Sequence, residues 1–254
     1  STFFVFANYS PFNAKDFYQS LVATTLFLSN YFFYLETDYF NDFSETAPLL
    51  HTWSLAVEEQ FYLVFPFFLI FISRFKYSLK ISLIILLCIS SLIFSFFESS
   101  INSTANFYLL QSRFWELLIG SLIALVMNHD NSFFQNFQTR LVSNLFSFLG
   151  IGLILFAILT FDYETTFPGI NALYPTIGTG LLIIFLNPQT ILYKFFSFPP
   201  LVYIGLLSYS LYLWHQPIFA ISRSYSLSSL SSSPSYYGQL MVTTNAHIGN
   251  YGVL

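Results

Sequence analysis

The chain has 254 residues, of which 55% are apolar, 22% are aromatic and only 8% are charged. Soluble domains carry about 25% charged residues, so this composition excludes a soluble globular protein and predicts an integral membrane protein. The net charge of −4 says little about partners, because the side on which a membrane protein carries its charges matters more than their sum. The lipid bilayer is the expected partner, and nucleic acid is not. Cys88 is the only cysteine, which excludes an intrachain disulfide and a thiolate metal site, and no metal site is predicted.

Apolar runs long enough to cross a bilayer recur along the chain. A transmembrane helix needs about 17–25 predominantly apolar residues. We therefore predict an all-α fold, a polytopic transmembrane helix bundle with about seven spans and no separate soluble domain. The sixth span is short and contains Pro175, Gly178 and Gly180, so we expect it to be tilted or broken. The predicted spans cover residues 17–35, 53–73, 79–97, 106–127, 141–161, 170–186 and 201–221.

Basic residues in the short loops predict the orientation of these spans. Cytoplasmic loops carry an excess of Lys and Arg. If the first span runs outward, the cytoplasmic side holds six of the eight basic residues, namely Lys15, Arg74, Lys76, Lys80, Arg140 and Lys194. The opposite loops are acidic and contain a single basic residue, Arg223, at their far end. We therefore expect the start of the chain on the cytoplasmic side.

The second predicted span contains two adjacent carboxylates, Glu58 and Glu59. A charged side chain at membrane depth costs roughly 2.5–3.5 kcal/mol on insertion scales, so such residues usually face a bundle interior and mark a pathway or reaction site. Successive helix positions differ by about 100°. We expect one carboxylate to line the interior and the other to pair with Arg113 or a neighbour, although one of them could lie near the headgroups. His51, just before this span, could be an ordinary interfacial residue.

Two further spans bring polar side chains to a similar depth. At about 1.5 Å per residue, the fourth span places Gln111 and Arg113 about 6–9 Å below the outer surface and Glu116 about 13–14 Å below it. The seventh span places His215 about 9 Å down. One face of that span carries three polar residues at helical spacing, Ser208, Tyr212 and His215. We therefore expect one shared polar site in the outer leaflet.

Structural interpretations of these residues stay open. Arg113 and Glu116 are i, i+3 neighbours and could form a self-neutralising pair. His215, beside Trp214 and Pro217, could be a packing residue at a kink.

Several catalytic motifs are missing from the sequence. There is no G-x-x-x-x-G-K-[ST] loop, no G-x-G-x-x-G after a strand, no H-E-x-x-H helix and no G-x-S-x-G elbow. Nucleotide hydrolysis, dinucleotide redox chemistry and zinc proteolysis are therefore disfavoured, and no bound cofactor is predicted. A group donor would have to be a soluble cytoplasmic thioester or a lipid.

Four segments resemble one known family. Residues 49–62, with the sequence LLHTWSLAVEEQFY, resemble the hallmark segment of the acyltransferase 3 family of membrane proteins, which includes bacterial O-antigen acetylases. Residues 107–125, 167–180 and 204–217 agree with the family in the same order. The likeness covers roughly residues 8–223 and is nearest to O-acetylases that also carry a C-terminal SGNH hydrolase-like domain.

The resemblance implies an enzyme of the bacterial cytoplasmic (inner) membrane. It takes an acyl group, usually acetyl from cytoplasmic acetyl-CoA, and passes it to a hydroxyl of a cell-surface carbohydrate such as the O-antigen of lipopolysaccharide. This chemistry needs a base for the hydroxyl and a donor for the oxyanion. Glu58 or Glu59, with His51 as partner, could supply the base and Arg113 the positive charge. The candidate catalytic residues are His51, Glu58, Glu59, Arg113 and Glu116. The candidate substrate-binding residues are Trp53, Ser54, Tyr62, Gln111, Ser208, Tyr212 and His215.

The chain also departs from the family pattern. Family members begin with two more spans, the first bearing a histidine thought to be catalytic, and they end with further spans. We expect residues 1–223 to form a partial acyltransferase 3 domain, residues 224–254 to form a disordered or out-of-frame tail, and the fragment to lack activity alone. It could then be a non-functional remnant. The alternative function is a transporter or flippase that uses the buried Glu and Arg residues for proton or solute coupling, and the absence of an obvious inverted repeat speaks against it only weakly.

Overall fold

The computed structural model describes residues 11–37, 47–129, 138–162 and 165–231. All the regular elements in these ranges are helical. Their order along the chain is α2 (Pro11–Thr25), α3 (Ser29–Thr37), α4 (Thr52–Ile72), α5 (Tyr77–Ile101), α6 (Ser103–Tyr108), α7 (Leu110–His129), α9 (Arg140–Thr160), the 3₁₀ turn η2 (Ile170–Ala172), α10 (Leu173–Phe185), α11 (Ile191–Phe196) and α12 (Pro199–Ser231). The predicted helical bundle is therefore confirmed.

Within the described residues, four helical stretches are long and apolar enough to cross a membrane. They are Thr52–Ile72, Tyr77–Ile101, Ser103–His129 and Arg140–Thr160, and they match the second to fifth predicted spans. The stretch Ile170–Phe185 is apolar but shorter, as the sequence predicted for the sixth span. Helix α12 has 33 residues and continues past the predicted end of the seventh span at 221. The total of seven spans stays a prediction.

The prediction of one continuous helix for the first span, residues 17–35, is wrong. Residues 17–35 form parts of two helices, α2 and α3, which meet at a turn where Phe27 adopts a φ of 57°. The turn is held by polar contacts to other elements: Gln60 donates from Nε2 to the carbonyl oxygen of Phe27 at 2.7 Å and to Asn30 Oδ1 at 2.8 Å. Asn30 is fully buried and donates to the carbonyl oxygen of Tyr108 at 3.2 Å. These tertiary bonds favour a break that the apolar pattern of the segment does not reveal.

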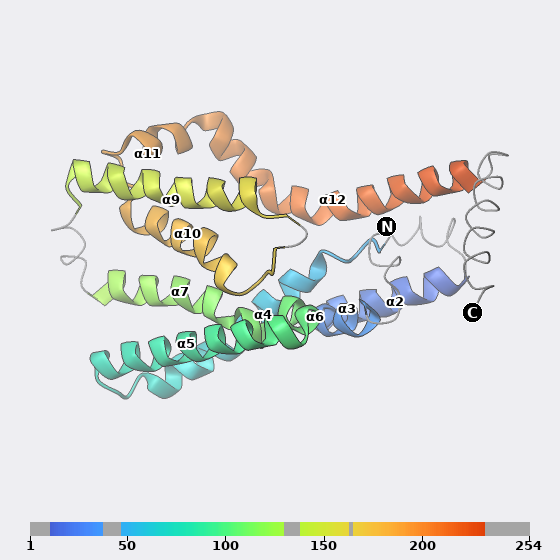
Figure 1. The fold of residues 1–254 in the computed structure, drawn as a ribbon, viewed down its shortest axis with the longest axis horizontal. Coiled ribbons are helices and arrows are strands. Elements are labelled where there is room, and N and C mark those ends of the chain that lie inside the picture. The colour runs from blue at the N-terminus through green and yellow to red at the C-terminus, as the bar shows by residue number, and fades with distance from the viewer. Residues whose placement is uncertain (1–10, 38–46, 130–137, 163–164, 232–254) are drawn as a thin grey trace, which may run out of the picture.

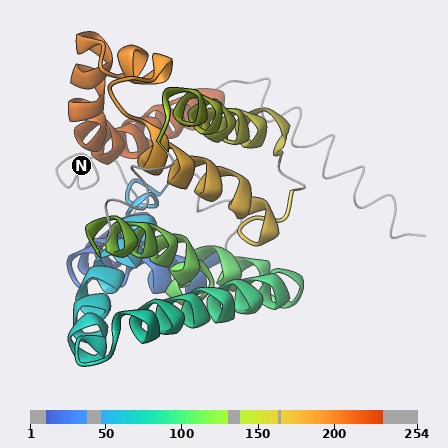
Figure 2. The same ribbon diagram turned by 90° about the vertical axis from the view of Figure 1, so that its left-hand side faces the viewer.

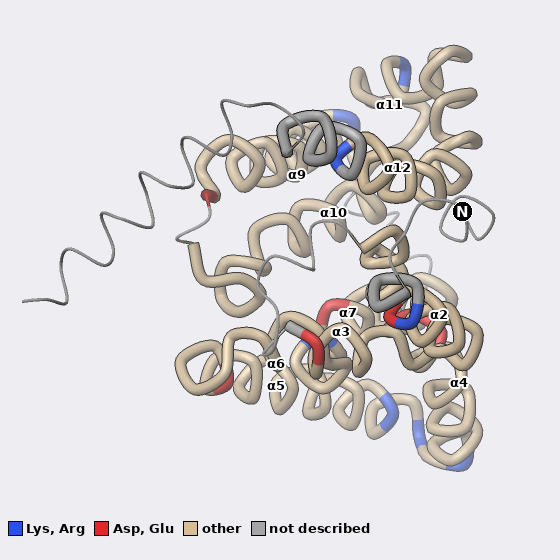
Figure 3. Tube along the Cα trace, turned by 90° about the vertical axis from the view of Figure 1, so that its right-hand side faces the viewer, with Lys and Arg blue, Asp and Glu red and all other residues tan. Residues whose placement is uncertain are grey.

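The break also determines where α2 lies. Helices α2 and α3 occupy one end of the molecule, and α2 begins at the right-hand extremity in Figure 1. The connection between α4 and α5, which contains Arg74 and Lys76, lies at the opposite end in Figure 1. In the end-on view of Figure 3, blue segments lie beside α4. Lys15 belongs to α2. The side of the membrane on which Lys15 and the other basic residues lie stays a prediction.

Two groups of helices pack separately, as the end-on view in Figure 2 shows. In the first group, α4, α5 and α7 bury an apolar cluster of Phe61, Phe65, Ile72, Ile84 and Leu118. In the second, α9 and α10 lie in close contact. Helix α10 also contacts α7, and the start of α12 lies in the second group. The polar side chains described next lie between α4 and α7 in the first group and at the contact of the start of α4 with α12.

Candidate functional site

The start of α4 is joined to the middle of α12 by hydrogen bonds. The Tyr212 hydroxyl donates to the carbonyl oxygen of His51 at 2.7 Å and lies 2.5 Å from the Ser54 hydroxyl. One turn further along α12, Gln216 Nε2 donates to the carbonyl oxygen of Ala47 at 3.2 Å. Residues 158 to 169 positions apart in the chain are thereby held together.

His51 is buried beside this junction. Its side chain is 7% exposed, and its ring lies edge-on to those of Tyr212 and His215, with centroid distances of 5.4 and 5.3 Å. Neither ring nitrogen of His51 has a hydrogen-bond partner among the described residues. Burial, reinforced by the neighbouring His215, lowers the pKa of His51 from 6.5 to about 4. The imidazole is therefore neutral at pH 7, and one nitrogen is free to accept a proton.

Arg113 on α7 lies in a box of aromatic rings. Its guanidinium carbon is 4.8 Å from the ring centroid of Trp53, 5.0 Å from that of Phe107 and 5.6 Å from that of Phe167. Such cation–π contacts stabilise a charge by about 0.5–2 kcal/mol each, more where the cation is desolvated. Trp53 belongs to α4 and Phe167 to the loop before η2, so the box joins three parts of the chain.

Glu116 lies one turn below Arg113 on α7. Its Oε2 is 3.8 Å from Arg113 Nη1, which is too long for the short paired bonds of a bidentate contact. Glu116 Oε1 and Arg113 Nε are both buried without a hydrogen-bond partner in the described part of the chain. Buried polar atoms are rarely left in this state. The pair therefore retains hydrogen-bonding capacity for a bound group.

A small pocket opens between α4 and α7 at this pair. It has a volume of about 80 Å³ and is lined by Trp53, Ser54, Val57, Glu58, Arg113, Glu116 and Leu117. A water molecule occupies about 30 Å³ in the liquid, so the pocket has room for a hydroxymethyl or carbonyl group rather than for a whole sugar. Two carboxylates, a guanidinium and a hydroxyl line this volume, and we call it the polar pocket.

The family of the chain follows from a comparison with known proteins. Residues 2–245 match the model of the acyltransferase 3 family, whose description is "Acyltransferase domain". The chain belongs to the acyltransferase 3 family. The four segments that resembled this family in the sequence supply His51, Arg113, Phe167 and Tyr212, so they meet at the polar pocket or the adjoining junction.

Several curated proteins are similar in sequence to this chain. YrhL of Bacillus subtilis (strain 168), named as a peptidoglycan O-acetyltransferase, is 30% identical over 211 residues, which are 79% of this chain and 33% of YrhL. The O-acetyltransferase OatA of Staphylococcus aureus (strain NCTC 8325 / PS 47) is 32% identical over 214 residues, 80% of this chain and 35% of OatA. An uncharacterized Haemophilus influenzae protein is 33% identical over 183 residues, 69% of this chain and 73% of that protein. The chain thus spans about a third of the length of YrhL and OatA. No solved structure matches it significantly.

The structure brings together eight of the predicted site residues of this acyltransferase 3 domain. His51, Trp53, Ser54, Glu58, Arg113, Glu116, Tyr212 and His215 line the polar pocket or the adjoining α4–α12 junction. Among these eight, the depth argument concerned Glu58, Arg113, Glu116, Tyr212 and His215. Their roles in a reaction stay predictions. In the described ranges, no three His, Cys, Asp or Glu side chains are arranged to hold a metal ion.

The other four candidates lie away from the polar pocket. Glu59 is exposed, and the expected partner Arg113 pairs with Glu116 instead. Tyr62 is 58% exposed, and Ser208 is exposed with its hydroxyl donated to the carbonyl oxygen of Gly205. Gln111 lines a separate hollow between α5 and α7. Depth along a helix does not give the direction of a side chain around it, because successive helix positions differ by about 100°.

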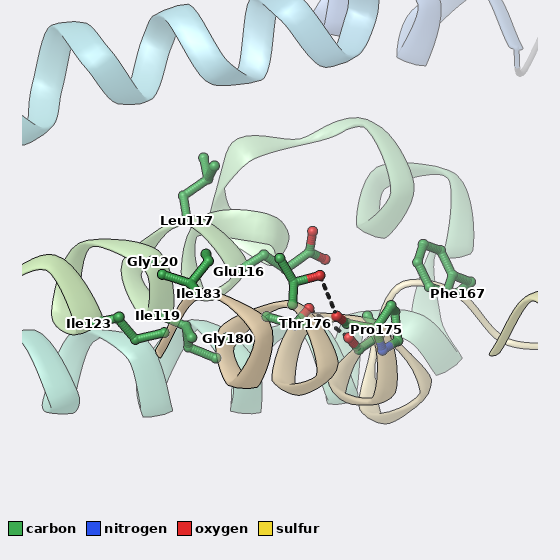
Figure 4. A pocket seen from close by; sticks show the side chains of 12 residues that line it. Glu116, Leu117, Ile119, Gly120, Ile123, Phe167, Pro175, Thr176, Gly180 and Ile183 are labelled. Carbon is green, nitrogen blue, oxygen red and sulfur yellow. Dashed lines mark hydrogen bonds between the residues drawn. The ribbon is translucent and has the colours of Figure 1, made fainter. Parts of the chain in front are cut away.

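Sequence reasoning missed the aromatic box and a second cavity. Phe107 and Phe167 are two of 34 phenylalanines, so their type carries no signal, although each begins a segment that resembles the family. The second cavity, here called the α7–α10 groove, has a volume of about 320 Å³ and shares Glu116 with the polar pocket. Figure 4 shows Gly120, Thr176 and Gly180 on its walls. Glycine and threonine in an apolar helix give no distinctive sequence pattern.

Proposed function

We propose that the polar pocket transfers an acyl group from a coenzyme A thioester to a hydroxyl of a cell-surface polysaccharide. The observation that carries the proposal is the meeting of Glu58, Arg113 and Glu116 in one small pocket of an acyltransferase 3 domain. The named relatives are O-acetyltransferases, and one is named for peptidoglycan, which supports acetyl as a donor group and a glycan as the acceptor. Family membership also favours transfer over transport.

The transfer step assigns a role to each charged residue. Glu58 removes the proton from the acceptor hydroxyl, whose oxygen bonds to the carbonyl carbon of the thioester. The bond between carbon and sulfur then breaks, and the thiolate takes up the proton from Glu58 and leaves as the coenzyme A thiol. The products are the ester and free coenzyme A, so no further reactant is needed.

Arg113 stabilises the negative charge that develops on the carbonyl oxygen. Its unpaired Nε–H is available as a donor, and the aromatic box keeps the guanidinium in place. A preorganised donor of this kind contributes about 100- to 1,000-fold to the rate. Glu116 balances the charge of Arg113 in the resting protein. His51, neutral at pH 7, is the second candidate base.

The finer features are parts of the same proposal. We assign the donor to the cytoplasm, the acceptor to the outer face and the protein to the cytoplasmic membrane of a bacterium. For the acceptor, the relatives' names favour a peptidoglycan strand over the O-antigen expected from the sequence.

The proposal is tested with membranes that contain the native-length protein. They are incubated with labelled acetyl-CoA, and base-labile label on the isolated cell-wall glycan is measured. We expect R113K to lower transfer by about 100-fold or more, because lysine cannot reproduce the donor geometry of arginine. The control Q111A, on the same helix but off the pocket, should retain at least half the activity. Full transfer by R113K would contradict the assigned role.

A further inference from the structure

The α7–α10 groove adjoins the polar pocket but plays no part in the step described above. At about 320 Å³ it is at the lower end of the range of roughly 300–1,000 Å³ that small-molecule sites occupy. Figure 4 shows its walls, with Ile119 and Ile123 from α7 facing Thr176, Gly180 and Ile183 from α10. It is therefore large enough to hold part of a substrate.

The residues that line the groove are mostly apolar, except at the end where Glu116 lies. Glu116 is its only charged lining residue, and the same side chain lines the polar pocket. The hydroxyl of Thr176 donates to the carbonyl oxygen of Ala172 at 2.7 Å, and that of Thr179 donates to the carbonyl oxygen of Pro175 at 2.8 Å. Both threonine protons are thus used within α10. If a ligand segment with amide groups bound here, its amides would have no hydrogen-bond partners, which costs free energy. A hydrocarbon chain has no such groups and could bind without this cost.

We propose that the groove holds the hydrocarbon chain of the acyl group that is transferred, with the carbonyl carbon beside Glu116 and Arg113. This inference rests on the proposed function and names its donor class, which is acyl thioesters with chains longer than acetyl. A water molecule occupies about 30 Å³, and a methyl group is of similar size. The methyl group of acetyl would therefore leave most of the groove unfilled.

Gly120 is the residue that determines how much of the groove a chain can use. A Cβ atom added at Gly120 meets no atom within 4 Å, so a larger side chain there would enter the groove without displacing the backbone. Gly180, on the opposite wall, is more constrained, because an added Cβ would lie 3.1 Å from Cδ1 of Ile123. A leucine at position 120 would therefore shorten the groove while leaving Glu116 and Arg113 in place.

The test compares donors of different chain length. Membranes with the native-length protein receive acetyl-CoA, butyryl-CoA or hexanoyl-CoA, and the acyl groups released by mild base from the cell-wall glycan are measured by mass spectrometry. We expect the wild type to transfer all three groups. G120L should lower the hexanoyl-to-acetyl ratio by 10-fold or more, since each methylene that loses its place costs about 10- to 200-fold in specificity. The matched control is G152L, because Gly152 is also an open helical glycine but lies on α9 outside the groove.

Three results would overturn the inference while the proposed function stands. They are a wild type that transfers acetyl alone, a G120L variant with an unchanged ratio, and a G120L variant that loses all three activities by the same factor. The last result would mean that the groove holds the coenzyme arm. If G120L does not reach the membrane, G120A must shift the ratio in the same direction, and no shift would also overturn the inference. Failure of the wild type to transfer any acyl group would instead refute the proposed function.

Discussion

The α9–α10 interface and the polar pocket show two opposite ways of packing helices. At the interface, an added Cβ at Gly150 would lie 2.7 Å from the carbonyl oxygen of Gly178, and one at Gly178 would lie 2.6 Å from that of Gly150. At the pocket and the adjoining junction, polar atoms of His51, Arg113 and Glu116 are buried without hydrogen-bond partners among the residues that the structure describes. The first region is closed by backbone contact and has no space for a ligand. The second retains both space and hydrogen-bonding capacity, which is what a reaction site needs.

The largest effect should come from filling the closed region. We expect G150L to prevent α9 from packing on α10, so that the protein does not fold. A side chain at position 150 would collide with the backbone of α10, which cannot move away. Gel filtration of a fluorescent fusion in detergent would show loss of the monodisperse peak. G152L is the control, since an added Cβ at Gly152 meets no atom within 4 Å. A monodisperse peak for G150L would contradict the conclusion that the α9–α10 interface has no space for a larger side chain.

A second prediction concerns the buried charge pair. Replacing one partner with E116L leaves Arg113 uncompensated and should destabilise the protein by about 3–5 kcal/mol. The double variant R113L/E116L should recover most of this loss, since an apolar pair of similar volume avoids the desolvation cost. Thermal unfolding in detergent measures both variants, and acyl transfer should be absent from both. A double variant less stable than E116L would contradict this description of the pair.

The third prediction is a dependence of stability on pH. The pKa of His51 is about 4 in the folded protein and 6.5 when unperturbed, so the unfolded chain binds more protons between these values. The contribution of neutral His51 to the free energy of unfolding is fully present above pH 6.5 and is lost as the pH falls towards 4. We therefore expect the wild type to lose more thermal stability than H51Q over this range. Equal losses in the wild type and H51Q would refute the prediction.

The smallest effect should come from the hydrogen bonds between α4 and α12. Y212F removes the hydroxyl that contacts His51 and Ser54 and should cost about 1 kcal/mol of stability. Because these bonds position the start of α4, we expect a several-fold loss of transfer activity as well. Y209F is the matched control, since Tyr209 is on the same helix and 61% exposed. Equal unfolding temperatures and activities for the two variants would exclude a positioning role for Tyr212.

The sequence predicted the features that depend on local composition. The lengths and apolar character of α4, α5, α7 and α9 follow from the need to cross a bilayer. The depth argument concerned Glu58, Arg113 and His215, and it did not predict the contact of His215 with His51, 164 positions away. Glu58 and Glu59 are both exposed, but only Glu58 lines the polar pocket. Depth could not distinguish the two residues, because only packing fixes the rotation of a helix.

Other features arise from contacts between distant segments and were beyond prediction. The break at Phe27 depends on the bonds of Gln60 to the turn, which exist only once α4 lies beside it. The aromatic box around Arg113 likewise requires Trp53 and Phe167 to arrive from two other segments. Trp53 was a candidate from the sequence, but in a chain with 22% aromatic residues no spacing marks Phe107 and Phe167 in advance.

The central claim is that the polar pocket is the site of acyl transfer, and adjacent carboxylates provide its most direct test. Membranes containing native-length E58Q and E59Q are compared for transfer of labelled acetyl from acetyl-CoA to cell-wall glycan. Both substitutions remove one negative charge from the same turn of α4, but only Glu58 lines the pocket. The account predicts a loss of about 100-fold or more for E58Q and a change within about twofold for E59Q. Equal activities of the two variants, or a larger loss for E59Q, would contradict it.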